Sequence, residues 1–253
     1  MDAFLEAVPQ KPHATRGGPC ALPILYRDAS QFGVFFRLDL GRAAALIGKD
    51  RRVEPWPIFG KAVAAIYAWD YRDSTVGAYG EVGLGIQCRR AGTRPRLLKL
   101  ATDMGAQDDQ GIWVVDLPVT TEGARDAGVD VWNYPKYVTP IATKWQDDGA
   151  SVTLGDELSL TIGPLGGPTM KAQPVVTYTE RDGRLLRTRI DVDHRVRWGG
   201  GGSAKLTIRG DGPMARSARA LGLESAPIVA AFRTDGFRAR LPAGIDLGPS
   251  RRD

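Results

Sequence analysis

Short apolar runs separated by turn residues extend along the whole chain, and their length and alternation are typical of β-strands. The runs that read as strands are residues 31–38, 62–71, 78–89, 97–102, 112–119, 139–146, 151–154, 157–162, 175–180, 185–192, 204–209, 228–233 and 237–241. Arg181-Asp-Gly-Arg184 joins two of them as a hairpin turn, because Asp-Gly adopts the backbone twist that paired strands require. The pattern therefore predicts about a dozen short strands.

Three stretches favour short helices instead. Asp39 can cap a helix that follows it directly. Thr120 or Thr121 can start a second helix, which Gly128 ends, and residues 213–223 have the pattern of a third. We therefore expect a β-rich fold, all-β or α+β, with a few short peripheral helices.

The chain divides into an arm and one domain. Residues 1–22 are rich in proline, glycine and charge without periodicity, which predicts an extended N-terminal arm across the surface or against a neighbouring subunit. Residues 23–253 then form a single domain. Within it, the glycines at 199–202 predict a flexible loop, and residues 163–168 predict a linker because they lack the Gly-Lys-Ser/Thr ending of a phosphate loop.

Composition narrows the classes of function. The net charge of +5 comes from dispersed arginines interleaved with acidic residues, which predicts a solvated surface and no nucleic-acid partner. Cys20 and Cys88 lie far apart, so neither a disulfide framework nor a zinc site is implied. The N-terminus lacks the features of a signal peptide, and no apolar run approaches about 18 residues, so we expect a cytoplasmic protein without membrane attachment.

One lysine stands in an apolar and aromatic run, Val131-Trp-Asn-Tyr-Pro-Lys-Tyr-Val138. A lysine in water has a pKa of about 10.4, but burial disfavours the cation and lowers the pKa of a buried lysine by up to about 3 to 5 units, which frees the amine for attack on a carbonyl. The alternative is that Lys136 lays its methylenes along Trp132 and Tyr134 with its head in solvent. On an extended backbone, Trp132, Tyr134, Lys136 and Val138 share one face, and Pro135 requires an edge or a bulge.

Acidic and aromatic candidates lie in the two strands before it. Tyr67, Trp69 and Tyr71 are spaced two residues apart and so lie on the same face of their strand. That face therefore lines an aromatic space. Glu81 has apolar neighbours, which indicates either a residue at the mouth of a pocket or a partner for a buried group, with a solvent-facing glutamate as the alternative. His194 stands between charged residues and is predicted to lie on the surface.

The lysine run, in the context Gly128-Val-Asp-Val-Trp-Asn-Tyr-Pro-Lys136, resembles the lysine motif of the acetoacetate decarboxylase family. Residues 64–81 resemble the strand, loop and Tyr-x-Glu segment of that family, and residues 202–208 and 227–242 resemble its closing strands. The resemblance implies a conical β-barrel with an interior pocket, no cofactor and a homo-oligomer. It also implies that Lys136 forms a Schiff base with a small carbonyl substrate and that Glu81 faces it as general acid or base.

The chain departs from this family where a decarboxylase needs charge. Tyr137 replaces the second lysine of the motif, which leaves burial as the main means of freeing the amine. The family's arginine aligns with Ala29, for which Arg27 is a weak substitute, and a further glutamate near residues 64–66 has no counterpart. These departures favour an aldolase, dehydratase or cyclase over a true acetoacetate or other β-keto acid decarboxylase.

Other side chains complete the predicted pocket. Tyr134, Tyr137 and Tyr79 are candidate hydrogen-bond donors to the substrate, and the candidate apolar walls are Trp113, Val115, Trp132 and Phe36. Structural packing explains each of these aromatic residues equally well. A barrel that binds a small molecule without covalent chemistry, or a cofactor-free cyclase or isomerase, therefore stays open as the second hypothesis.

Overall fold

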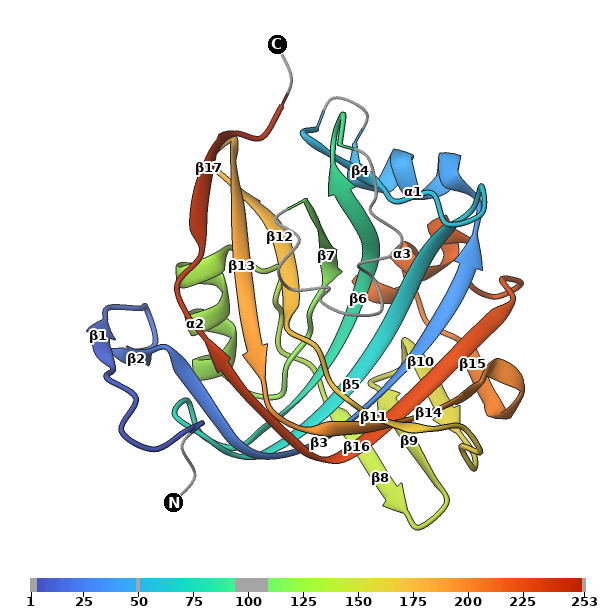
Figure 1. Cartoon of the computed structure of the whole chain (residues 1–253), viewed down its shortest axis with the longest axis horizontal. Helices are drawn as coiled ribbons and strands as arrows, with labels where there is room; N and C mark the ends of the chain where they lie inside the picture. Colours follow the sequence, from blue (N-terminus) through green and yellow to red (C-terminus); the bar gives the residue numbers. More distant parts are fainter. Residues whose placement is uncertain (1–3, 49–50, 94–108, 252–253) are drawn as a thin grey trace.

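A computed structural model describes residues 4–48, 51–93 and 109–251 (Figure 1). The helices are α1 (Leu40–Ile47), α2 (Glu122–Trp132) and α3 (Pro213–Leu221), with a 3-10 turn at Gly201–Ser203. The strands are β1 (Lys11–His13), β2 (Cys20–Leu22), β3 (Ile24–Leu38), β4 (Val53–Pro55), β5 (Ala62–Ser74), β6 (Tyr79–Arg90), β7 (Gln110–Asp116), β8 (Ile141–Gln146), β9 (Gly149–Leu154), β10 (Leu158–Ile162), β11 (Thr169–Lys171), β12 (Val175–Arg181), β13 (Arg184–Val192), β14 (Arg195–Gly200), β15 (Ala204–Ile208), β16 (Ile228–Leu241) and β17 (Ile245–Pro249). The β-rich prediction with a few short helices is confirmed.

The largest sheet closes on itself. Its strands follow the order β11-β14-β16-β3-β5-β6-β7-β12-β13-β17, and β13 also pairs with β16 through Asp191↔Arg240 and Val192↔Ala239. This extra pairing joins the two arms of the sheet into a barrel. Only the contact between β7 and β12 is parallel among the described strand pairs of this sheet. Closure leaves one face of each barrel strand directed inward and the other outward.

A second layer covers part of the outside of the barrel. The sheet β15-β10-β9-β8 and the helices α1 and α3 pack against β3, β5 and β6 (Figure 1). Phe36, Ile66 and Ile86 from the barrel meet Leu160 and Met214 from this layer, and each is fully buried. The main hydrophobic core therefore lies between barrel and outer layer, which leaves the barrel interior available for a cavity.

The three predicted helices exist, but the second is longer than expected. Asp39 accepts a hydrogen bond from the Arg42 amide, and Thr121 accepts one from the Ala124 amide, so both predicted N-caps are confirmed. The prediction that Gly128 ends α2 is wrong. The helix continues to Trp132 and ends where Asn133 adopts a left-handed backbone with φ of 51°.

The glycines at 199–202 were predicted to form a flexible loop, and this is also wrong. Gly199 and Gly200 belong to β14 and pair with Ala231 and Ala230 of β16. A Cβ on Gly201 would stand 2.1 Å from the carbonyl oxygen of Ile228. Close approach of the backbone therefore explains the glycine at position 201.

Residues 11–22, which include the turn between β1 and β2, pack on the domain. Where an extended arm was expected, β1 and β2 form a small antiparallel hairpin, and Arg16 after β1 pairs with Asp130 of α2 at 2.9 Å. The predicted Asp-Gly hairpin turn is confirmed by positive φ angles of 49° at Asp182 and 73° at Gly183. The predicted strand at 97–102 lies outside the described residues.

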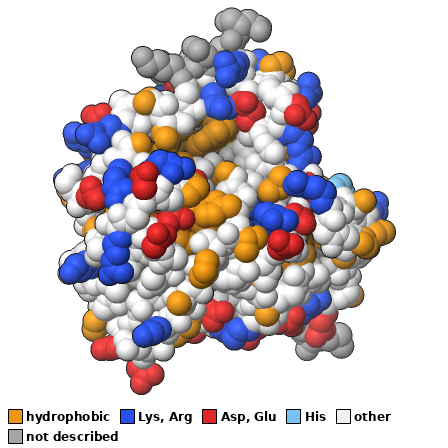
Figure 2. Space-filling view, turned by 180° about the vertical axis from the view of Figure 1, so that it is seen from behind, with side chains coloured by type: hydrophobic (Ala, Val, Ile, Leu, Met, Phe, Trp, Pro, Cys, Tyr) orange, Lys and Arg blue, Asp and Glu red, His pale blue; other side chains and the backbone are white. Residues whose placement is uncertain are grey.

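The surface agrees with the reading of dispersed charge. Figure 2 shows basic and acidic side chains interspersed over one face of the molecule, without a continuous basic stripe on that face. In the described part of the chain, no helix is both long and apolar enough to cross a membrane.

Candidate active site

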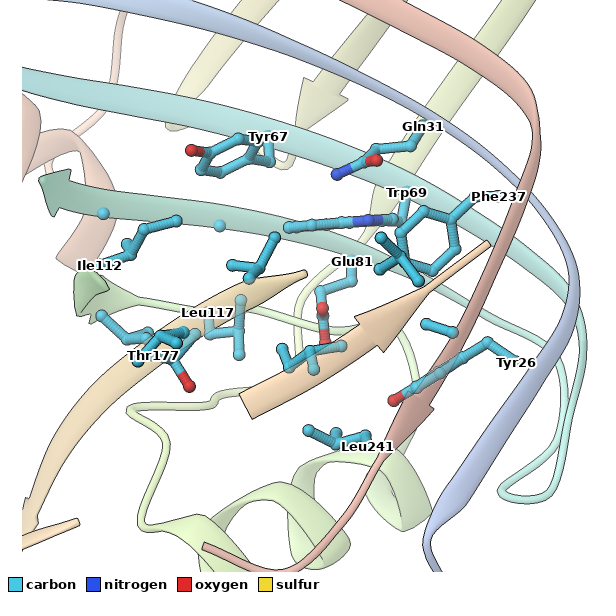
Figure 3. Close-up of a pocket in the computed structure, with 18 of the residues that line it drawn as sticks. Tyr26, Gln31, Tyr67, Trp69, Glu81, Ile112, Leu117, Thr177, Phe237 and Leu241 are labelled. Atoms are coloured by element: carbon cyan, nitrogen blue, oxygen red, sulfur yellow. The ribbon is translucent and has the colours of Figure 1, made fainter. Parts of the chain in front are cut away.

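The barrel encloses a cavity of about 400 Å³. Aromatic side chains from three strands form much of its wall, among them Phe35 of β3. Figure 3 shows Tyr67 and Trp69 of β5 and Phe237 of β16 around the same space. The predicted aromatic face of residues 67, 69 and 71 does line this space. A concave, mostly apolar cavity with a few polar groups is the usual form of a small-molecule site.

Lys136 and Glu81 meet inside this cavity. The Nζ of Lys136 lies 2.5 Å from Oε2 of Glu81, and the two side chains are 5% and 7% exposed. The charged ends are therefore removed from water together, and each stabilises the other. Lys136 does not extend to solvent, and Glu81 is not a solvent-facing strand residue.

The backbone that carries Lys136 is not the strand that the sequence predicted. Residues 133–137 form an irregular segment after α2, in which the Lys136 amide donates to the Tyr134 carbonyl at 2.7 Å. The Leu117 amide donates to the Pro135 carbonyl at 3.1 Å, which ties the segment to the end of β7. Of the four residues expected to share one face, Trp132, Tyr134 and Lys136 line the cavity although Trp132 is helical, whereas Val138 is 41% exposed and does not line it. A tied irregular segment can still hold one side chain in a fixed direction.

Tyrosine hydroxyls surround the ion pair. Tyr71 donates to Oε1 of Glu81 at 3.4 Å, and the Tyr79 ring centroid lies 5.5 Å from Nζ of Lys136. The hydroxyls of Tyr79 and Tyr26 are 3.1 Å apart. Burial raises the pKa of Tyr26, Tyr71 and Tyr79 well above the ordinary value, so each stays a neutral hydroxyl. The alternation of side chains along β5 predicted that Tyr71 faces inward, whereas no feature of the sequence predicted this for Tyr26.

Trp132 and Tyr134 line the cavity and brace its wall. Their rings stack with centroids 5.7 Å apart. The indole of Trp132 donates to the Pro242 carbonyl at 2.8 Å, and the hydroxyl of Tyr134 lies 2.8 Å from Oγ1 of Thr177. Both polar ends already have protein partners. These contacts fix the segment that leads into Lys136.

Comparison with known sequences decides the family. The sequence pattern described as acetoacetate decarboxylase (ADC) matches residues 8–162, which include both Glu81 and Lys136. The chain belongs to the acetoacetate decarboxylase family. No curated protein sequence matches the chain significantly.

Solved structures of the acetoacetate decarboxylase fold are similar over nearly the whole chain. Acetoacetate decarboxylase from Legionella pneumophila is 15% identical with a TM-score of 0.64, over 97% of this chain and 94% of that one. The enduracididine biosynthesis enzyme MppR is 15% identical with a TM-score of 0.60, over 90% and 88%. An acetoacetate decarboxylase-like enzyme from Sphingomonas wittichii RW1 is 13% identical with a TM-score of 0.59, over 89% and 93%. At these identities the likeness establishes the fold.

Tyr137, at the position of the family's second lysine, lies outside the cavity. Its hydroxyl donates to Oε1 of Glu157 at 2.9 Å, and the other oxygen of Glu157 accepts from the Ala215 amide at the start of α3 at 3.1 Å. The expectation that Tyr137 contacts substrate therefore fails. Adjacent residues in this segment point to different sides, so Lys136 reaches the cavity and Tyr137 does not.

Three predicted wall residues also face away. Phe36, Trp113 and Val115 belong to the core between barrel and outer layer, and their neighbours Phe35, Ile112 and Val114 line the cavity instead. Side chains alternate across a strand, so an error of one residue moves each prediction to the opposite face. Arg27 is exposed and pairs with Asp73 at 3.2 Å, so it does not replace the arginine of the family.

His194 was predicted to lie on the surface, but it lines the cavity. Its ring centroid lies 4.9 Å from that of Phe237, and burial lowers the pKa of His194 to about 4. The imidazole is therefore neutral at neutral pH. Among the residues that the structure describes, no three His, Cys, Asp or Glu side chains gather closely enough to hold a metal ion.

Proposed function

We propose that this member of the acetoacetate decarboxylase family is a lyase that forms a Schiff base between Lys136 and a carbonyl substrate, with Glu81 moving the protons. The observation that carries the proposal is the buried contact of 2.5 Å between Nζ of Lys136 and Oε2 of Glu81. A nucleophile needs a base within hydrogen-bond reach, and this pair meets that requirement inside a cavity of ligand size.

The proposed reaction begins from the ion pair. Lys136 transfers one proton to Glu81, which leaves a neutral amine beside a neutral carboxylic acid. The amine nitrogen attacks the carbonyl carbon, and Glu81 gives its proton to the carbonyl oxygen as the C–N bond forms. Glu81 then takes a proton from the new ammonium and returns it to the hydroxyl, which leaves as water. The products of this stage are a protonated imine, a carboxylate and one water molecule.

The protonated imine draws electrons from the neighbouring carbon. That carbon can lose CO2, undergo retro-aldol cleavage, or lose a proton before aldol condensation or dehydration. We favour the aldolase, dehydratase or cyclase outcome over acetoacetate decarboxylation because Tyr137 replaces the second lysine and faces Glu157. One solved structure of MppR holds the condensation product of pyruvate and imidazole 4-carboxaldehyde, which supports carbonyl condensation as chemistry that this fold accommodates.

Reductive trapping tests the proposal. The protein is incubated with a panel of ketones, aldehydes and keto acids, reduced with borohydride and mapped by peptide mass. An adduct is expected on Lys136, and it should disappear in Lys136→Met and Lys136→Arg. Lys171→Met is the matched control, because Lys171 also lines the cavity but is 69% exposed, and it should keep the adduct. An adduct that survives Lys136→Met contradicts the assignment.

A binding barrel without covalent chemistry is the second candidate. The ion pair itself favours it, because the nitrogen of Lys136 is occupied by its contact of 2.5 Å with Glu81 in the resting protein. The same trapping experiment separates the two functions. Saturable binding of a carbonyl ligand without any reduced adduct would support the barrel and contradict the lyase.

A further inference from the structure

The charged side chains around the cavity do not favour the binding of an anionic ligand. Glu81 and Lys136 neutralise each other, and Lys171 lies at the rim, 3.8 Å from Asp193. His194 is neutral at neutral pH. Among the described residues that line the cavity, these are the ionisable groups other than tyrosine. A carboxylate bound beside Lys136 would stand next to the carboxylate of Glu81 without a cation of its own, which is costly away from water.

The walls instead offer aromatic faces. Tyr67 and Trp69 lie with ring centroids 5.5 Å apart, and Trp69 and Tyr71 stack at 6.3 Å with an interplanar angle of 10°. These rings form a continuous surface along the inner face of β5. Aromatic ligands gain from offset stacking on such a surface beyond simple burial. The volume of about 400 Å³ lies in the range of drug-sized ligands.

Two polar groups on this surface, the indole nitrogen of Trp69 and the amide of Gln31, make no hydrogen bond to the described part of the chain. Gln31 is 7% exposed and lines the cavity. The amide atoms of Gln31 stay accessible from the cavity, so a ligand or water there can complete their hydrogen bonds. Figure 3 shows its amide directed into the same space as Trp69.

Gln31, Trp69 and Glu81 lie in register across three neighbouring strands. Gln31 of β3 stands opposite Trp69 of β5, and Trp69 stands opposite Glu81 of β6. Adjacent strands are about 4.8 Å apart, so the backbones of Gln31 and Glu81 are separated by about 10 Å with the indole between them. A bicyclic aromatic ring spans this distance with one oxygen at each end.

We propose that the cavity takes an uncharged aromatic ketone or aldehyde, with its carbonyl at Lys136, its ring against Trp69 and a second oxygen at the amide of Gln31, and that it discriminates against short keto acids. The reactive carbonyl rests on the proposed imine chemistry, whereas the preference for an uncharged aromatic ligand does not. The ligand class follows from three separate features, which are the neutral ion pair, the aromatic wall and the unpartnered amide.

Matched naphthalene ligands test the inference by calorimetry. The first is a methyl naphthyl ketone with a hydroxyl on the far ring, and the second lacks the hydroxyl. The third carries a carboxylate in place of the acetyl group, and the fourth is the alcohol obtained by reducing the ketone. Pyruvate and acetoacetate complete the set. We expect the hydroxylated ketone to bind at least about tenfold more tightly than the carboxylate.

Variants at Gln31 test its role separately. Gln31→Leu should weaken binding of the hydroxylated ketone by about fivefold to tenfold and leave the ligand without the hydroxyl nearly unchanged. Gln31→Lys places a cation on the wall and should shift the preference toward the carboxylate. Circular dichroism and thermal melting establish that each variant folds. Equal losses for both ketones in Gln31→Leu would overturn the contact with Gln31.

The alcohol separates this inference from the proposed function. Because it has no carbonyl, it cannot form an imine, so its binding to the native protein reports the fit of the ring and the hydroxyl alone. If the ketone and alcohol bind but no adduct is trapped, the Schiff-base function fails and the ligand class stands. If pyruvate or acetoacetate is trapped at Lys136 while the naphthyl ketone does not bind, the ligand class is overturned and the function stands.

Discussion

The side chain of Lys136 lies directly on Gly128, one turn before the end of α2. A Cβ added to Gly128 would stand 2.5 Å from both Cδ and Cε of Lys136 and 3.2 Å from Nζ. The two separations of 2.5 Å are far below van der Waals contact. The glycine therefore leaves the space through which the lysine reaches Glu81, although a glycine inside a helix lowers its stability by about 1 kcal/mol relative to alanine.

Gly128→Ala should displace Lys136 and reduce the yield of the borohydride adduct by at least about tenfold. The extra methyl group cannot fit unless the lysine or the helix moves. Gly123→Ala is the matched control in the same helix, because a Cβ there meets nothing within 4 Å. It should keep the adduct and stabilise the fold by about 0.5 to 1 kcal/mol. Equal adduct yields in the two variants would contradict this packing role.

The ion pair predicts a specific pattern of stability. Lys136→Met and Glu81→Gln should each destabilise the fold by about 3 to 5 kcal/mol, because each leaves one buried charge without its partner. The double variant should be more stable than either single one, since no lone charge remains. Urea denaturation of the four proteins gives the coupling energy directly. Additive losses in the double variant would show that the two charges are not coupled.

The sequence predicted strands and caps well because those signals are local. Asp39, Thr121 and the Asp-Gly turn at residues 182–183 each act within a few residues of themselves. The inward face of β7 was not predictable in the same way. Both faces of β7 are apolar, so Trp113 and Val114 give no alternation that would distinguish the core from the cavity.

The candidate site depended on information from distant parts of the chain. Lys136 and Glu81 are separated by 55 residues, and only the resemblance to a family connected them before the structure did. His194 was wrongly predicted to lie on the surface because its neighbours in the chain are charged. Its neighbours do not share its surroundings, because Arg195 is exposed and Asp193 pairs with Arg238, while His194 lines the cavity.

His194 should make the fold sensitive to acid. Its pKa is about 4 in the folded protein and about 6.5 in the unfolded chain, because burial disfavours the imidazolium. Its contribution is fully present above pH 6.5 and is lost as pH falls from 6.5 to 4, by up to about 3 kcal/mol. His194→Gln should flatten this part of the stability profile. An unchanged slope between pH 4 and 6.5 in this variant would show that the histidine is not responsible.

Asp116 should act in the opposite direction in an overlapping range of pH. It is 8% exposed, and burial raises its pKa to about 6 from an ordinary value of 3.8. A carboxyl group with a raised pKa favours the folded state below its ordinary pKa, and this advantage is lost as pH rises through 6. Asp116→Asn should therefore stabilise the protein at pH 8 by up to about 3 kcal/mol and have little effect at pH 3.

Stability is measured by denaturation across this pH range for Asp116→Asn, for His194→Gln and for the double variant. Comparison of the three separates the contributions of the two groups. The two groups do not share a site, since Asp116 is influenced by Glu157 and Arg216 whereas His194 packs on Phe237. Distant groups contribute independently, so the double variant should show the sum of the single effects at each pH. A lower stability of Asp116→Asn at pH 8 would mean that the carboxylate makes a favourable interaction stronger than its burial cost.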